Sequence, residues 1–148
     1  MNAIDLANAM KTAATQIADE FQSSEDTFLP AFGMYSEHSG GFMDFKVIDI
    51  DEYTATAIKA RIGEHLPDIV GLVAESTIIV GADHRQQRAL TIHTVDRTQE
   101  HIYYAEIHRK ENRPATLGAW KCTNKIATET DISAALHTVR DSEPCATW

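Results

Sequence analysis

The alternation of apolar and polar positions between residues 69 and 109 predicts the centre of the fold. Three short segments rich in β-branched and aromatic residues follow one another there, over residues 69–80, 89–95 and 102–109. Connections containing Asp, Arg, Gln and Gly separate them. Short strand-forming runs divided by such residues are typical of antiparallel strands joined by turns. We therefore expect these segments to form a meander in the core sheet.

The register of this meander can be predicted by requiring that one face be apolar. Side chains alternate along a strand, so a slip of one residue exchanges the two faces. Pairing Ile78 with Leu90 and Ile92 with Ala105 gathers the apolar side chains on one side. The opposite, polar face would then carry Glu75, Thr77, Thr91, His93, Tyr104, Glu106 and His108.

Apolar residues at three- and four-residue spacings predict three helices, over residues 4–21, 51–66 and 131–140. Asn2 is a suitable N-cap for the first helix, and Asp131 or Thr130 for the third. Pro67 should end the second helix, because proline lacks the N–H group that a helix needs.

Two further apolar segments, residues 27–35 and 42–50, flank a loop that contains Gly40 and Gly41. This arrangement is typical of a β-hairpin. Pro30 cannot donate to a sheet ladder, so we expect the first strand at an edge or with a bulge. Alternation in the second strand predicts three core-facing side chains, Met43, Phe45 and Val47.

These elements predict an α+β fold in the order α-β-β-α-β-β-β-(β)-α, where the bracketed strand is a short segment at 117–122. This order favours a mainly antiparallel sheet of five or six strands with about three helices packed on one face. We expect one domain over residues 1–140 and a mobile tail over residues 141–148.

Composition narrows the classes of function. The chain has 148 residues, enough for one domain, and a net charge of −9, which argues against general nucleic-acid binding. No apolar run approaches the roughly 20 residues of a membrane span, and no secretory signal is recognisable. Cys122 and Cys145 do not form a CxxC pair, so we expect reduced thiols. A cytoplasmic location without membrane binding is the expectation.

Motifs of common enzyme classes are not found in the sequence, including the P-loop, GxSxG, GxGxxG, HExxH and zinc-type CxxC patterns. The leading interpretation is therefore a chain with no catalytic residues and no cofactor. The polar sheet face offers an alternative, in which His93 acts as base, Glu75 or Glu106 orients it and Tyr104 donates to an oxyanion. In a metal-binding version of this alternative, the ligands are His93, Glu106 and His108.

The polar connection at residues 81–88 is a second candidate site. It contains His84, Arg85 and Arg88, which together are suited to grip a carboxylate or phosphate. Arg109 would join an anion-binding rim if it lies at the same end of the sheet.

The sequence thus favours a small, non-catalytic binding or accessory protein that acts through protein contacts, including contacts within a homodimer. A phage- or mobile-element-encoded inhibitor or regulator is one such protein that is compatible with the size and acidity. The alternative is an enzyme, or a metal- or small-ligand-binding protein, that uses the Glu/His cluster of the polar face.

Overall fold

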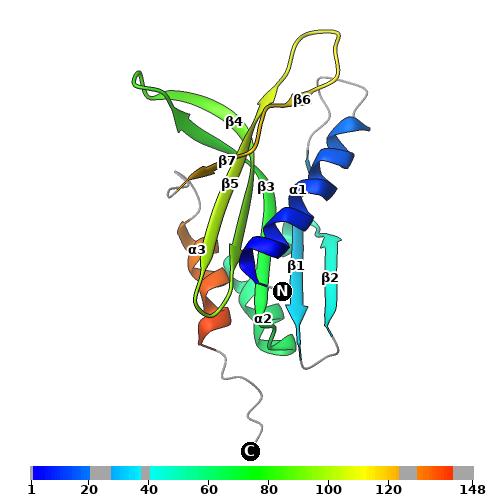
Figure 1. The fold of residues 1–148 in the computed structure, drawn as a ribbon, viewed down its shortest axis with the longest axis vertical. Coiled ribbons are helices and arrows are strands. Elements are labelled where there is room, and N and C mark those ends of the chain that lie inside the picture. Colours follow the sequence, from blue (N-terminus) through cyan, green and yellow to red (C-terminus); the bar gives the residue numbers. More distant parts are fainter. Residues whose placement is uncertain (1, 21–27, 38–40, 124–129, 142–148) are drawn as a thin grey trace, which may run out of the picture.

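The structure is a computed structural model that describes residues 2–20, 28–37, 41–123 and 130–141 (Figure 1). Its helices are α1 (Ala3–Asp19), α2 (Ala55–His65) and α3 (Thr130–His137), with 3-10 turns η1 (Ile50–Glu52) and η2 (Thr138–Arg140). Its strands are β1 (Ala31–Ser36), β2 (Phe42–Val47), β3 (Ile69–Val80), β4 (Arg85–Val95), β5 (Glu100–His108), β6 (Thr116–Leu117) and β7 (Lys121–Thr123). The predicted α+β class and order of elements are confirmed. The expected mobile tail lies outside the described residues, apart from Asp141.

The sheet is antiparallel, in the order β2-β1-β3-β4-β5-β6, with β7 also paired to β5. Strand β1 lies between β2 and β3 and pairs with both in an unbroken register, so the prediction that the strand containing Pro30 lies at an edge or carries a bulge was wrong. Pro30 precedes β1, and its carbonyl accepts a hydrogen bond from the N–H of Ile48 at 2.9 Å. The ladder therefore does not need the N–H that proline lacks.

The register between β3 and β4 differs from the predicted one by three residues. Leu90 pairs with Glu75 instead of Ile78, and on the other side Ile92 pairs with Tyr103 instead of Ala105. The odd shift moves every β3 side chain to the opposite face relative to β4, whereas the even shift between β4 and β5 preserves the faces. The predicted polar face is therefore wrong in one respect, because Glu75 and Thr77 do not share a face with His93.

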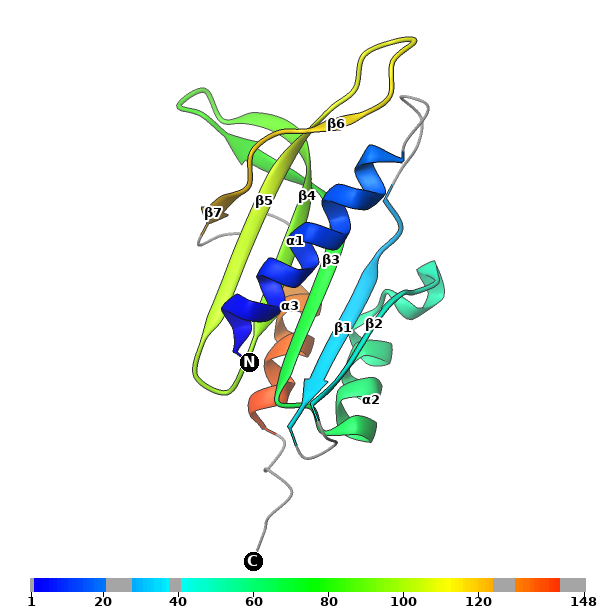
Figure 2. The same ribbon diagram turned by 45° about the vertical axis from the view of Figure 1, so that its right-hand side comes forward.

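Helices cover both faces of the sheet, not one face as predicted (Figures 1 and 2). Helix α1 packs on one face, where Leu6 and Met10 join a buried cluster that includes Val73, Leu90 and Ile92. Helices α2 and α3 pack on the other face around Phe32, Val70, Leu72 and Val95. Both faces of β3 are consequently apolar, and this is why apolar clustering did not reveal its register.

Helix α1 begins where the sequence predicted. The side chain of Asn2 accepts a hydrogen bond from the N–H of Asp5 at 3.0 Å, and the Asp5 carboxylate accepts one from the N–H of Asn2 at 3.0 Å. This reciprocal capping box satisfies two N–H groups that an isolated helix end would leave unpaired. The predicted final residue, Phe21, lies outside the described residues.

One predicted core residue of the hairpin is not buried. Val47 is 51% exposed, whereas its neighbour Ile48 is 3% exposed and belongs to the core beneath α2. Strand β2 is an edge strand and pairs only with β1 among the described strands (Figure 1). Phe45 does pack against the α1 cluster as predicted, while the side chain of Met43 is outside the described part.

No helix in the described part of the chain is long and apolar enough to cross a membrane.

Candidate metal centre

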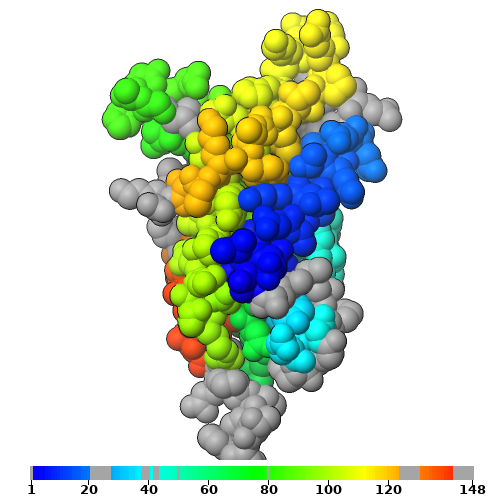
Figure 3. Space-filling view, in the orientation of Figure 1, coloured from blue at the N-terminus to red at the C-terminus, as the bar shows by residue number. Residues whose placement is uncertain are grey.

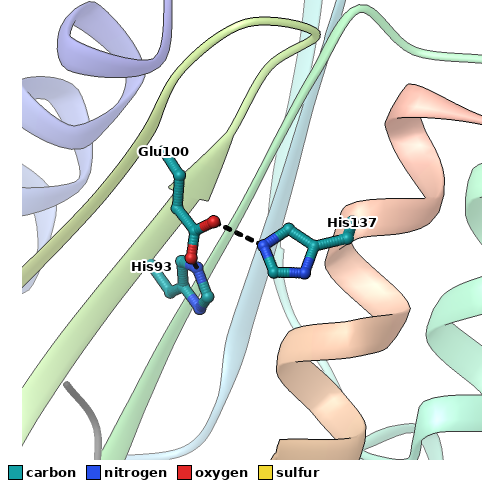
Figure 4. Close-up of side chains that lie close together, drawn as sticks. All are labelled: His93, Glu100 and His137. Carbon is teal, nitrogen blue, oxygen red and sulfur yellow. Dashed lines mark hydrogen bonds and ion pairs between the residues drawn. The ribbon is translucent and has the colours of Figure 1, made fainter. Parts of the chain in front are cut away.

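The β4–β5 hairpin and the end of α3 bring two histidines and a glutamate together (Figure 4). His93 lies on β4, Glu100 is the first residue of β5 and His137 is the last residue of α3. The pairing of Val95 with Glu100 places the Glu100 side chain on the same sheet face as His93. Because α3 packs on that face, the sheet and the helix together define the cluster.

The Glu100 carboxylate joins the two imidazoles. His93 Nε2 lies 2.8 Å from Glu100 Oε1, and His137 Nε2 lies 2.5 Å from Glu100 Oε2. The two rings meet edge to face, with centroids 6.0 Å apart and planes at 82°. One nitrogen from each histidine and one Glu100 oxygen all lie within 4.8 Å of one another. Three potential ligand atoms therefore lie close to one another.

Ser133 forms a hydrogen bond with the other ring nitrogen of His93, with 3.2 Å between Ser133 Oγ and His93 Nδ1. It lies four residues before His137 on α3, and residues at this spacing share a helix face. A hydroxyl both donates and accepts hydrogen bonds, so Ser133 is compatible with either tautomer of the His93 ring. The structure therefore gives His93 a fixed orientation with a partner at each ring nitrogen.

The protonation states of the cluster follow from its burial and charges. His93 is only 4% exposed, and burial is the largest cause that lowers its pKa; the Glu100 carboxylate opposes this, while His137 and Arg140 reinforce it. For Glu100, burial alone would raise the pKa, but hydrogen bonds from His137 and His93 outweigh burial, and the net pKa is lowered. At neutral pH the cluster therefore presents a neutral His93 imidazole and a Glu100 carboxylate.

These donors match the chemistry of a divalent transition-metal ion. Imidazole nitrogen and carboxylate oxygen are common ligands of Zn²⁺, and they bind it in their deprotonated forms. Within the described ranges, His93, Glu100 and His137 are the one group of His, Cys, Asp or Glu side chains with this convergence. The fit therefore rests on donor type, spacing and protonation together.

The structure separates the other residues of the predicted polar-face site. Tyr104 and Glu106 lie on β5 on the same sheet face as His93, whereas Glu75 lies on the opposite face. Glu106 and His108 pair with each other, with 3.8 Å between Oε2 and Nε2, at the opposite end of β5 from Glu100. Of the predicted metal ligands, only His93 belongs to the cluster.

Glu100, His137 and Ser133 were not identified from the sequence. Glu100 lies just before the predicted strand at residues 102–109, in a polar connection. The four-residue spacing of Ser133 and His137 was a usable signal for a shared helix face. Nothing in the sequence, however, indicated that this helix docks over β4.

The residues predicted to bind an anion lie along the β3–β4 hairpin. Arg88 lies on β4 and donates to Glu75 Oε2 through Nη2 at 2.7 Å and through Nε at 3.2 Å. His84 belongs to the exposed β3–β4 turn, with a φ of 53°, and Arg85 is the exposed first residue of β4. Arg109 donates to the other Glu75 oxygen at 2.5 Å, which joins it to Arg88 through a shared carboxylate.

The chain matches no known protein family, no curated protein and no solved structure at a significant level.

Proposed function

We propose that this protein binds a divalent metal ion of the zinc class through His93, Glu100 and His137. The observation that carries the proposal is the convergence of their ligand atoms within 4.8 Å. The lowered pKa values of His93 and Glu100 support it, because both groups are held in the forms that coordinate metal.

The hydrogen bond between Ser133 and His93 would allow His93 to act as a metal ligand. In the present geometry His93 Nε2 faces the Glu100 carboxylate and Nδ1 faces Ser133. To coordinate a metal through Nε2, the ring must carry its proton on Nδ1, and the Ser133 oxygen can accept that hydrogen bond. A ligand histidine held in this way by its second nitrogen is typical of protein metal sites.

Three protein ligands leave one position of a tetrahedral zinc site for water or another small ligand. The side chains of Glu100 and His137 are 30% and 39% exposed, so the cluster is reachable from solvent. The buried His93 forms its inner side. We therefore infer an accessible ion and assign no catalytic residue around it.

Calorimetric titration with Zn²⁺ after chelator treatment tests the proposal, with native mass spectrometry to count the ions. We expect one Zn²⁺ per chain, and a loss of affinity of at least about a hundredfold in His137→Ala, since a ligand is removed. His65→Ala is the matched control, because His65 lies on α2 outside the cluster and is exposed. Equal affinity in the two variants, or no stoichiometric zinc in the parent protein, would contradict the proposal.

A second candidate is the protein-contact function that the sequence favours, and the edge strand β2 supports it. This strand ends the sheet, and no described strand pairs with its outer edge. Its last residue, Val47, is an apolar side chain with half its surface exposed. Pairing of two β2 edges would form a homodimer. Light scattering of the parent protein and of Val47→Lys tests this candidate, which fails if the parent protein is a monomer at high concentration.

A further inference from the structure

The sheet divides into two arms at the end remote from the metal cluster. Strand β4 pairs with β3 along its whole length, but it pairs with β5 only from Ala89 to Val95. Beyond Glu106, β5 pairs only with β6, which lies along its other edge. The β3–β4 hairpin and the β5–β6 segment therefore separate, and Figures 1 and 3 show them as two lobes with a notch between them.

A depression of about 410 Å³ lies where the arms separate. It is lined by Gln86, Gln87, Arg88, Ile107, His108, Arg109 and Lys110. The side-chain amide of Gln87, which belongs to this lining, donates a hydrogen bond to the carbonyl of Ile107 at 3.0 Å. This bond joins β4 and β5 beyond the last pair of their ladder. The side chains that line the depression are therefore held by contacts within the sheet.

The charge of this depression is positive in a protein whose net charge is −9. Its lining includes three permanent cations, Arg88, Arg109 and Lys110, and no carboxylate. Glu75 lies behind the two arginines with its side chain 9% exposed. The lining itself is therefore cationic, and the carboxylate that the two arginines share is largely buried.

Glu75 orients both guanidinium groups. Arg88 and Arg109 bind separate oxygens of its carboxylate, and Arg88 Nη1 also donates to Thr77 Oγ1 at 3.0 Å. The three donors that Arg88 uses in these bonds leave one N–H on each of its terminal nitrogens. Two planar donor groups on a common carboxylate form a preorganised cationic surface.

We propose that this depression binds a phosphate group, as the dianion of a phosphate monoester. A phosphate dianion offers this cationic lining two negative charges, whereas a carboxylate offers one. Guanidinium groups suit phosphate because they donate two N–H bonds in one plane, and Lys110 adds a point charge. The depression is open to solvent, so a phosphate group attached to a larger molecule can enter it. The proposal does not depend on metal binding.

Nuclear magnetic resonance titration at constant ionic strength tests this proposal with phenyl phosphate, inorganic phosphate and acetate. We expect phenyl phosphate to shift the amides of residues 86–88 and 107–110, and acetate to bind at least about tenfold more weakly. Lys110→Ala should weaken phenyl phosphate binding about tenfold, and Arg109→Lys should do so although it retains the charge. Comparison with inorganic phosphate separates recognition of a monoester from recognition of the free ion.

Arg85→Ala is the matched control, because Arg85 is an exposed arginine of the same hairpin that does not line the depression. Binding should be unchanged in this variant and also in His137→Ala, which separates the phosphate proposal from the metal proposal. Equal binding of acetate and phenyl phosphate would overturn the proposal. So would an equal loss in Arg85→Ala and Lys110→Ala, since both variants remove one surface charge.

Discussion

The backbone N–H of Ala3 donates a hydrogen bond to Asp96 Oδ2 at 3.0 Å, across 93 positions of sequence. The other carboxylate oxygen, Oδ1, accepts from the N–H groups of Thr98 and Gln99 at 2.8 and 2.6 Å. One buried carboxylate therefore closes the β4–β5 turn and also fixes the first residue of α1. It acts at the positive end of the helix dipole, where a negative charge is stabilising.

Replacing Asp96 by alanine should destabilise the fold strongly. The variant leaves the buried Ala3 N–H without its acceptor and removes the two bonds that shape the turn. We expect the free energy of unfolding to fall by on the order of 2–4 kcal/mol, measured by urea denaturation. Asp83→Ala, which removes an exposed carboxylate in the β3–β4 turn, should change it by less than about 0.5 kcal/mol. Equal losses would contradict this role.

Acidification should remove the stabilisation that the Asp96 carboxylate provides. Burial alone would raise the pKa of Asp96, but hydrogen bonds from Thr98, Ala3 and Gln99 outweigh it and hold the pKa below the ordinary 3.8. The folded state therefore binds the proton less tightly than the unfolded state. The stabilisation is complete above pH 3.8 and declines as the pH falls through the lowered pKa. Below pH 3.8 the stability of Asp96→Asn should depend less steeply on pH than that of the parent protein, and equal slopes would contradict this prediction.

Local sequence patterns predicted the three helices and the Asn2 cap of α1, because these depend on neighbouring residues; the predicted caps of the third helix, Thr130 and Asp131, lie inside α3. The Asn2 cap and the buried stripe of α1 are set within a few turns of chain. The register of β3 could not be predicted in the same way. Val70 and Leu72 face α2 and α3, whereas Ile69 and Val73 face α1, so either assignment of its faces is apolar.

The candidate metal centre was predicted only as far as His93. His93 is a polar residue in an otherwise apolar part of β4, and the alternation along this strand indicates the face on which it lies. The geometry of the β4–β5 turn brings Glu100 to His93, and the packing of α3 on the sheet brings His137 to the same place. Both depend on tertiary packing, which residue spacing in a single sequence does not contain. The proposed pairing of His93 with Glu106 failed because Glu106 lies at the far end of β5.

Removal of the Ser133 hydroxyl should weaken metal binding without removing a ligand. Ser133 Oγ lies 3.2 Å from His93 Nδ1, so Ser133→Ala leaves the ligand histidine without the partner that fixes its tautomer. We expect the Zn²⁺ affinity to fall roughly tenfold to a hundredfold, measured by competition with a chelator. Ser133→Thr keeps a hydroxyl and should recover most of this affinity. Equal affinities in the two variants would show that the hydroxyl does not act on the metal site.

Met10 fills a space that two glycines of adjacent strands leave open. Gly33 on β1 and Gly71 on β3 are paired in the ladder, and the buried Met10 side chain of α1 lies over both. A Cβ atom at Gly71 would lie 2.5 Å from Met10 Cε and 3.0 Å from Thr94 Cγ2. The glycine pair therefore sets how closely α1 approaches the sheet.

Gly71→Ala should lower the free energy of unfolding by about 1–3 kcal/mol, because the added methyl group overpacks the contact. Met10→Ala should cost about 2–5 kcal/mol by leaving a cavity. The double variant should lose less than the sum of these costs, because the new methyl group occupies part of that cavity. Gly63→Ala is the control: a Cβ atom there meets nothing within 4 Å, and alanine should stabilise α2 by about 0.5–1 kcal/mol. Additive losses in a urea-denaturation cycle would show that Met10 and Gly71 do not share this space.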